Sequence, residues 1–381
     1  MRLGLSLLNF RPGRIGGTET FLRQLLVHLP AAMPDDRLVA VLHRDLAETL
    51  ATPGFERVVV PRGDRAVVAA RILEAYTPWR DRALERLFGS LALDVTLFPQ
   101  QSIYPKRAPG KAVLTAVDVQ HLIHPEHFGL FDRTFRPAIY PFSMARAEMV
   151  ATISNHVRDT VVERCGVAPD KVLSIPLGWT PRGRQEATPL PSLGTGYLYY
   201  PAYSHPHKNH LALLRSYAAL RARGLVTARL VLTGGRTGYW KTIARAIREL
   251  ELGAHVLDLG LVPYADVPRL YAGAEAVLFP TRYEGFGLPV LEAAEQGKKV
   301  ITSRLPIFDE IGVPARFQID FERPEELAAA LALPGPTVLE RTPATWQDMA
   351  RGYAALLRRV AEAPATWPPA PPAPSSLAAV P

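Results

Sequence analysis

Two glutamates flank a segment rich in glycine in the last third of the chain. The segment from Glu284 to Glu292 reads Glu-Gly-Phe-Gly-Leu-Pro-Val-Leu-Glu. Pro289 favours the first turn of a helix, which predicts Glu284 in the preceding loop and Glu292 within the first turn or so. Glycine lets backbone approach a ligand closely, and the free N–H groups of a helix start favour an anion such as a diphosphate. Carboxylates on either side can accept hydrogen bonds from sugar hydroxyls.

An isolated pair of glutamates has a second interpretation, in which the acidic groups only complement the helix dipole. The surrounding sequence favours ligand binding. The stretch 279–294 resembles the E-x7-E signature of retaining glycosyltransferases of family 4 (glycosyl transferases group 1), which have the two-domain GT-B fold. The resemblance implies that Glu284 holds the transferred sugar and Glu292 the nucleotide ribose. The donor-facing residues between them are then Gly285, Phe286, Gly287 and Leu288.

A histidine-rich segment containing Lys208 follows a predicted strand at 197–200 and opens a predicted helix. Its sequence at 205–210 is His-Pro-His-Lys-Asn-His. A lysine there adds a full charge to the partly positive helix end. The segment resembles the one in which the family carries the lysine that binds the donor phosphate. The resemblance therefore gives this role to Lys208. The alternative is an exposed lysine at a helix start without a ligand.

The second phosphate-binding cation of the family has no obvious counterpart in this chain. Many relatives carry an arginine five or six positions before the lysine, where this sequence has Tyr203 and Ala202. His205, His207 and Arg236 remain open as replacements, of which Arg236 follows a Gly-Gly pair.

A glycine pair, Gly16-Gly17, separates the first predicted strand from the first predicted helix. Bare backbone N–H groups at a helix start can hold a donor phosphate from the opposite side of a cleft. The pair is similar to the family's N-terminal Gly-Gly loop. By itself it is weak evidence, because strand–glycine–helix turns are common in α/β proteins.

The acceptor-side candidates are Asp118 and His121. They follow a predicted strand at 112–117 and so lie at the carboxyl end of a strand, where open sheets bind ligands. Some family members have the sequence Asp-Leu-Gln-His at this point, and this chain has the similar sequence Asp-Val-Gln-His. The alternative is a capping aspartate beside ordinary loop histidines.

No metal or cofactor is expected in the reaction. His124, His127 and His156 show no known ligand spacing. The sequence also lacks an Asp-x-Asp pair that could hold a divalent cation on a diphosphate. We therefore expect Lys208 and the helix ends to neutralise the leaving diphosphate.

Composition and charge narrow the class of protein. The chain has 381 residues, 48% of them hydrophobic, a single cysteine and a formal net charge of +8. The charges are scattered, without a run of five or six of one sign, so nucleic-acid binding is not expected. No secretory signal or apolar stretch of membrane-spanning length is visible, so we expect a cytoplasmic protein. The segment 62–91 mixes arginine with Trp79 and Phe88; a helix covering a sheet is favoured over contact with a membrane surface.

Alternating strands and helices predict two doubly wound α/β domains, as the GT-B resemblance also implies. We place an acceptor-side domain at 1–185 and a donor-side domain at 195–340, with a looser linker at 180–196. A helix at 346–362 is expected to return to the first domain, as in that fold. The Pro- and Ala-rich tail 363–381 is expected to be disordered.

The predicted activity is transfer of a hexose, with retention, from a nucleotide-diphosphate sugar to a saccharide or lipid-linked acceptor. Surface polysaccharide synthesis is the expected setting, with peripheral membrane contact left open. The alternatives are a nucleotide-sugar epimerase of the same fold and a non-catalytic nucleotide-sugar binding protein.

Overall fold

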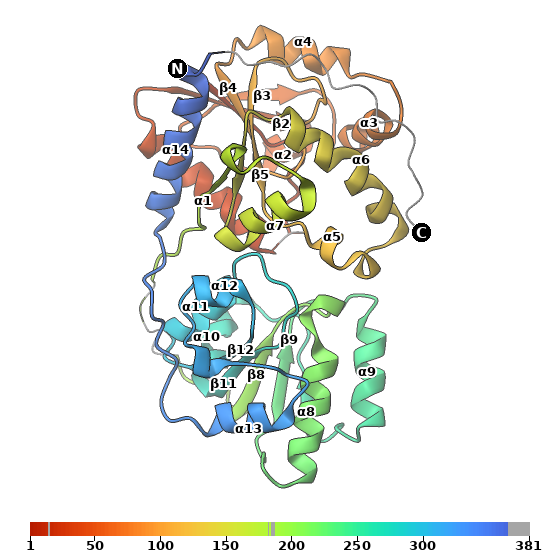
Figure 1. Ribbon diagram of the computed structural model, residues 1–381, viewed down its shortest axis with the longest axis vertical. Coiled ribbons are helices and arrows are strands. Elements are labelled where there is room, and N and C mark those ends of the chain that lie inside the picture. Colours follow the sequence, from red (N-terminus) through yellow and green to blue (C-terminus); the bar gives the residue numbers. More distant parts are fainter. Residues whose placement is uncertain (14–15, 182, 184–186, 365–381) are drawn as a thin grey trace.

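The computed structural model describes residues 1–13, 16–181, 183 and 187–364. These residues form two lobes, each built on a parallel β-sheet with helices on its faces (Figure 1). The predicted fold of two doubly wound α/β domains is therefore confirmed. The tail predicted to be disordered lies, from residue 365 onward, outside the described residues, as do linker residues 182 and 184–186.

The first lobe holds a seven-stranded sheet with the order β3-β2-β1-β4-β5-β6-β7. The strands are short apolar runs, and all four residues of β4 and of β6 are buried, as expected of a sheet covered on both faces. The strands are β1 (Arg2–Ser6), β2 (Arg37–His43), β3 (Glu56–Val60), β4 (Val95–Phe98), β5 (Lys111–Ala116), β6 (Met149–Thr152) and β7 (Val172–Ser174).

Helices cover this sheet on both sides. The first, α1 (Gly16–Ala32), buries apolar residues at 21, 22, 25, 26 and 29, as its 3.6-residue spacing predicts. The segment 62–91 forms two helices rather than one, because Asp81 accepts a hydrogen bond from the Leu84 N–H and caps a new helix start. The remaining elements are α2 (Arg44–Thr49), α3 (Asp64–Tyr76), α4 (Arg82–Ser90), α5 (Gln120–Ile123), α6 (Leu130–Arg146), α7 (Asn155–Cys165) and the 3₁₀ turns η1 (Pro125–His127) and η2 (Pro169–Lys171).

The second lobe holds a six-stranded sheet with the order β10-β9-β8-β11-β12-β13. Its strands are β8 (Tyr197–Pro201), β9 (Leu230–Thr233), β10 (Val256–Asp258), β11 (Ala274–Phe279), β12 (Lys299–Ser303) and β13 (Gln318–Ile319). Its helices are α8 (His210–Ala222), α9 (Trp240–Glu249), α10 (Val267–Gly273), α11 (Leu288–Glu295), α12 (Pro306–Glu310) and α13 (Pro324–Ala332), with 3₁₀ turns η3 (Pro206–Lys208), η4 (Tyr264–Asp266) and η5 (Ala315–Phe317).

The last helix, α14 (Trp346–Glu362), packs on α1, β4 and β5 of the first lobe (Figure 1). The buried hydroxyl of Tyr353 lies 3.1 Å from that of Thr115, and Arg358 pairs with Asp36 at 2.9 Å. The chain can cross there because residue 178 is glycine: a Cβ at Gly178 would lie 2.4 Å from the backbone of Trp346. Among the described residues, no helix combines the length and apolar character that crossing a bilayer requires.

Candidate active site

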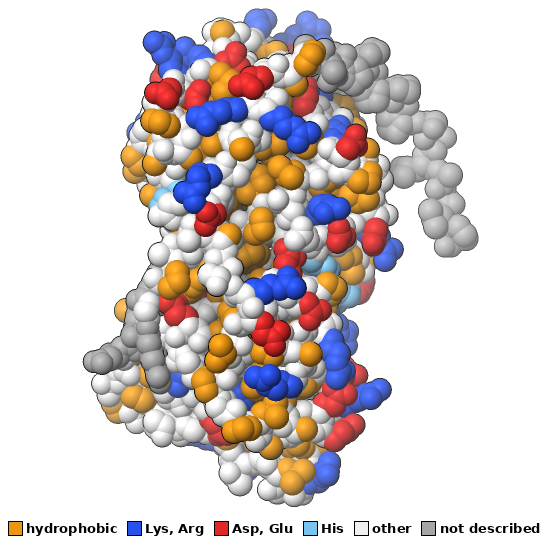
Figure 2. Space-filling model, turned by 60° about the vertical axis from the view of Figure 1, so that its left-hand side comes forward, with side chains coloured by type: hydrophobic (Ala, Val, Ile, Leu, Met, Phe, Trp, Pro, Cys, Tyr) orange, Lys and Arg blue, Asp and Glu red, His pale blue; other side chains and the backbone are white. Residues whose placement is uncertain are grey.

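The carboxyl ends of the two sheets meet at the boundary between the lobes. The backbone N–H of Val119, after β5, donates to the hydroxyl of Tyr283, after β11, at 3.2 Å. The hydroxyl of Ser154, after β6, donates to the carbonyl of Gly285 at 2.8 Å. In the space-filling view the molecule narrows at this level, and histidine side chains are visible at its right-hand edge (Figure 2). Ligands of open α/β sheets bind at such carboxyl ends.

Lys208 and Glu284 form an ion pair at this boundary. The Nζ of Lys208 lies 2.6 Å from Oε2 of Glu284, and each side chain keeps 22% of its surface exposed. The two residues are far apart in sequence, but they follow β8 and β11, which are neighbours in the sheet. A cation and an anion are thus presented side by side and accessible to solvent.

The loop that carries Lys208 is held by backbone contacts. The buried Tyr200 donates its hydroxyl to the carbonyl of Lys208 at 2.6 Å. The carbonyl of His207 accepts from the Arg282 N–H at 2.8 Å and from the Thr281 hydroxyl at 3.2 Å. Lys208 ends the 3₁₀ turn η3, and α8 begins only at His210, so the lysine precedes the helix rather than opening it. These bonds fix the lysine loop to the loop that carries Glu284.

The glycine-containing loop before α11 starts that helix and also contacts the first lobe. Gly287 has φ +97°, a conformation that favours glycine, and Pro289 occupies the first turn of α11 as predicted. A Cβ at Gly285 would lie 3.0 Å from the carbonyl oxygen of Val117, so this glycine permits close approach of the first lobe. Phe286 is buried and Leu288 is half-buried against the core. The backbone N–H groups at the start of α11 therefore lie beside the lobe boundary.

Two residues predicted to bind the sugar donor make their contacts with residues other than Lys208 and Glu284. Glu292 lies in the second turn of α11, not the first, and accepts a hydrogen bond from the Tyr271 hydroxyl at 3.5 Å. Arg236 is 55% exposed, forms an ion pair with Asp258 and lies 5.1 Å over the ring of Trp240. The acidic partner of Arg236 reduces the positive charge that it can offer to a phosphate.

Gly16 and Gly17 begin α1 on the first lobe. No heavy atom lies within 4 Å of a Cβ built on Gly17, so space is open beside the helix start. The carboxylate of Glu19 accepts a hydrogen bond from the Gly13 N–H at 2.6 Å and ties the described part of the preceding loop to the helix. The first-turn N–H groups of a helix lack intrahelical partners and favour an anion.

Asp118 and His121 lie together on the first lobe, at the end of β5 and in α5. The pKa of Asp118 is raised by burial, and the nearby charge of Arg136 opposes this only in part. Burial and the charge of Arg136 both lower the pKa of His121, to about 4, so its imidazole is neutral at physiological pH. The ring of His121 packs edge-on against Tyr140, and its buried Nδ1 has no hydrogen-bond partner.

The second lobe matches a family model. Residues 191–333 match the model described as glycosyl transferases group 1. The part of the chain that resembles the glycosyl transferases group 1 family is therefore its second lobe. It is 28% identical over 214 residues to the O-antigen chain mannosyltransferase B of Escherichia coli, a match that covers 53% of this chain and 55% of that protein. The chain thus spans about half the length of the curated relative it matches.

Solved structures share the fold of the whole chain. Sucrose-phosphate synthase from Thermosynechococcus elongatus superposes with a TM-score of 0.64 at 14% identity, covering 95% of this chain and 96% of that one. The Anabaena protein HepE, in complex with UDP and glucose, superposes with a TM-score of 0.60 at 18% identity, covering 95% and 97%. At such identities the likeness establishes the fold, and the GT-B architecture is confirmed.

The structure adds basic residues to the first lobe that sequence reasoning missed. Arg71 of α3 donates to the Ser102 hydroxyl at 2.8 Å and lies 5.6 Å over the ring of Phe135. Burial lowers the pKa of Arg71 to about 10, which leaves it charged at neutral pH. The charges of Arg71 and Arg136 both act on Tyr140 beside His121. No sequence signal distinguishes these arginines from the other arginines of α3 and α6.

A second missed residue, Glu310 of α12, joins the two lobes. Its two carboxylate oxygens accept from the backbone N–H groups of Asn155 at 2.8 Å and His156 at 3.0 Å. These donors belong to the first turn of α7, where a carboxylate is favoured by the helix dipole. His156, considered in the sequence with His124 and His127, instead lies here, with its ring 5.8 Å from that of Tyr283.

Proposed function

We propose that this chain is a retaining glycosyltransferase that moves a hexose from a nucleotide-diphosphate sugar to a saccharide or lipid-linked saccharide. The observation that carries the proposal is the Lys208–Glu284 ion pair at the meeting point of the two sheets. A sugar diphosphate offers a partner to each member of the pair. Its phosphate is an anion for the lysine, and its sugar hydroxyls are donors for the glutamate.

The donor is assigned mainly to the second lobe. In this proposal Lys208 and the N–H groups from Gly285 to Leu288 meet the diphosphate, and Glu284 holds the sugar. Glu292 holds the nucleotide ribose, and the Gly16-Gly17 turn approaches the phosphates from the first lobe. Donors fixed in place before reaction stabilise the charge that grows on the leaving diphosphate. Lys208 and the helix ends carry this charge stabilisation, so the transfer needs no metal or cofactor.

The acceptor is assigned to the first lobe. His121 is neutral near pH 7, so its imidazole is available to position an acceptor hydroxyl through hydrogen bonds, with Asp118 beside it. The leaving phosphate itself takes the proton of that hydroxyl, on the face from which it departs, which retains the anomeric configuration. Arg71 adds positive charge that suits the diphosphate of a lipid-linked acceptor, while Arg136 is paired with Asp132 at 3.2 Å.

The matched relative points to the sugar and the setting. It is an O-antigen chain mannosyltransferase, which favours mannose from GDP-mannose as the first donor to test and surface polysaccharide as the product. UDP- and dTDP-sugars are the next donors. The expected place of action is the cytoplasm, at the inner face of the membrane where lipid-linked acceptors lie.

A donor panel tests the proposal. Thermal unfolding is followed with GDP, UDP, dTDP and their sugar conjugates, because a ligand that binds only the native state raises the melting temperature. The stabilising donor is then incubated with lipid-linked saccharide acceptors, and the anomeric configuration of the product is read by NMR. Transfer with retention, unchanged by EDTA, is the expected result. An epimerised donor without an acceptor supports the epimerase instead, and binding without turnover supports the non-catalytic protein.

A further inference from the structure

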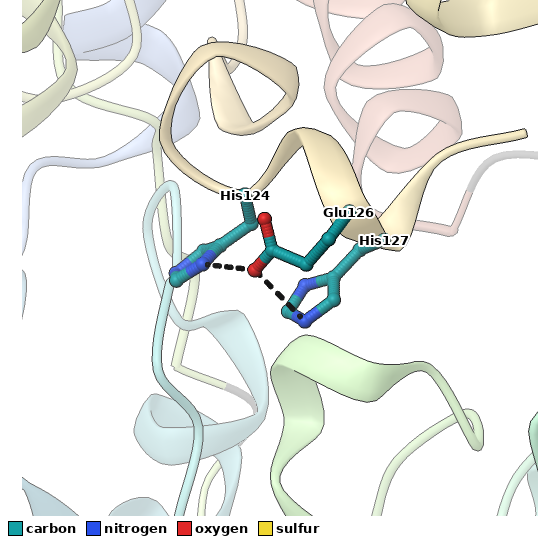
Figure 3. Close-up of side chains that lie close together, drawn as sticks. All are labelled: His124, Glu126 and His127. Carbon is teal, nitrogen blue, oxygen red and sulfur yellow. Dashed lines mark hydrogen bonds and ion pairs between the residues drawn. The ribbon is translucent and has the colours of Figure 1, made fainter. Parts of the chain in front are cut away.

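Two histidines and a glutamate gather at the edge of the lobe boundary, beside η1. The Nδ1 of His124 lies 3.2 Å from Oε1 of Glu126, and the Nε2 of His127 lies 3.4 Å from the same oxygen. Figure 3 shows both imidazoles directed at that oxygen, with the second lobe's ribbon beneath them. The three ligand-type atoms all lie within 4.8 Å of one another.

The local backbone explains why the two rings lie together. The His127 N–H donates to the carbonyl of His124 at 3.0 Å, which closes a 3₁₀ turn. Side chains three residues apart eclipse in such a turn. The rings of His124 and His127 are accordingly stacked, with centroids 4.8 Å apart. The pair is therefore set by the fold of η1.

Two of the separations in this group match those of a metal site. Two ligand atoms each about 2.1 Å from a tetrahedral zinc ion lie about 3.4 Å apart, close to the separations of 3.2 and 3.4 Å found here. Two imidazoles on such an ion place their ring centroids about 5 Å apart. Glu126 is 63% exposed while His124 is 19% and His127 11% exposed, so an ion can enter from solvent past the carboxylate.

A third imidazole faces this group from the second lobe. The ring centroid of His207 lies 6.4 Å from that of His127, about 1 Å more than two ligands of one tetrahedral ion require. His207 precedes Lys208 in η3, so an ion held here would join η1 to the lysine loop.

We propose that His124, Glu126 and His127 bind one divalent transition-metal ion of the zinc type, with His207 completing the ligand set across the lobe boundary. Imidazole nitrogens suit zinc, cobalt, nickel and copper, whereas magnesium and calcium take oxygen ligands. The ion holds the two lobes together and takes no part in transfer. The proposal does not depend on the glycosyltransferase assignment, because His124, Glu126 and His127 lie outside the proposed donor and acceptor sets. In this proposal His207 serves the metal rather than replacing the second phosphate-binding cation.

Metal binding by the full, tag-free chain tests this. After treatment with EDTA and dialysis, Zn²⁺ binding is measured by calorimetry and by the rise in melting temperature, and Co²⁺ binding by visible absorption. One ion per chain is expected, with a tetrahedral cobalt spectrum and no competition from equimolar Mg²⁺. Absence of saturable one-to-one binding, or equal competition by Mg²⁺, overturns the proposal.

Variants assign the ligands. His124→Ala, His127→Ala, Glu126→Gln and His207→Ala should each weaken Zn²⁺ binding about tenfold or more, at least the effect of losing an outer-shell partner. The matched control is His28→Ala, since His28 lies on α1 and contacts Gln24. Unchanged affinity in His124→Ala or His127→Ala refutes the site, and unchanged affinity in His207→Ala refutes the link between lobes. Circular dichroism of each variant confirms that it is folded.

Discussion

The hydroxyl of Tyr283 accepts a hydrogen bond from the backbone N–H of Val119 at 3.2 Å, across the boundary between the lobes. Each partner is the chain neighbour of a candidate site residue, Glu284 on one side and Asp118 on the other. The charges of both carboxylates reach Tyr283 and help burial to raise its pKa. One direct contact between the lobes thus joins the segments that carry the donor-side and acceptor-side carboxylates.

Glu284→Ala should abolish most transfer while leaving nucleotide affinity within a few-fold. The carboxylate is proposed to hold the sugar, so its loss removes a contact aimed at the reacting part of the donor. A fall of about 10²–10³-fold in kcat is expected, the usual effect of losing one such polar contact. Glu249→Ala, an exposed glutamate of α9 paired with Arg245, is the control. Unchanged turnover in Glu284→Ala would remove this residue from the site.

Lys208→Ala should weaken the binding of nucleoside diphosphate far more than that of the bare nucleoside. A charge-assisted hydrogen bond contributes about 1.5–3 kcal/mol, so a loss of about 10–100-fold in diphosphate affinity is expected. Calorimetry with the two ligands measures the difference, and Lys241→Ala, on the solvent face of α9, serves as the control. Equal losses for both ligands contradict the phosphate role.

Glu310→Ala should lower stability by loosening the contact between lobes. The substitution leaves the Asn155 and His156 N–H groups at the start of α7 without their carboxylate partner, and loss of such a cap costs about 1–2 kcal/mol. Thermal or urea unfolding measures the change. Glu163→Ala, an exposed glutamate on the same helix, should stay within about 0.5 kcal/mol of the parent protein. A similar loss in both variants would show that the contact with the second lobe has no special effect.

Stability should fall in acid because of His210. Burial and the charges of Lys208 and His205 lower the pKa of this buried histidine to about 3, below the ordinary value of 6.5. The unfolded chain therefore takes up a proton first, so the contribution is complete above pH 6.5 and is lost as the pH falls below it. The loss at pH 5 is about 2 kcal/mol. In His210→Gln the free energy of unfolding should depend less on pH between 6.5 and 5; an unchanged slope contradicts the assignment.

Gly178→Ala should displace the last helix. A Cβ at this position would lie 2.4 Å from the backbone of Trp346, which has no room to move without shifting the start of α14. We expect a loss of more than about 2 kcal/mol in the free energy of unfolding. Gly166→Ala is a less suitable control because its φ is +65°, so Gly129→Ala is used, where no heavy atom lies within 4 Å and φ is −65°. Equal stability of both variants would contradict the packing argument.

The sequence by itself determined the repeating strand–helix pattern and the loop chemistry within single segments. Apolar spacing at 21, 22, 25, 26 and 29 predicted α1, and Pro289 predicted the start of α11, because both signals act through neighbouring residues. The Glu284–Glu292 spacing suggested a sugar-nucleotide site only through its resemblance to the E-x7-E signature, and that assignment stays a prediction. The sequence analysis did not separate α3 from α4, because the start of α4 depends on one side-chain contact, the Asp81 cap.

Only the tertiary structure decided which distant residues meet. Because β8 and β11 are neighbours in the sheet, Lys208 can pair with Glu284. Because the two lobes face each other, His207 lies near His127, and Glu310 accepts hydrogen bonds from the start of α7. The structure also pairs a residue that the sequence left available. Arg236 was a candidate for binding phosphate, but in the structure it forms an ion pair with Asp258. Such pairings depend on sheet order and side-chain direction, which follow from packing of the whole chain rather than from residue spacing.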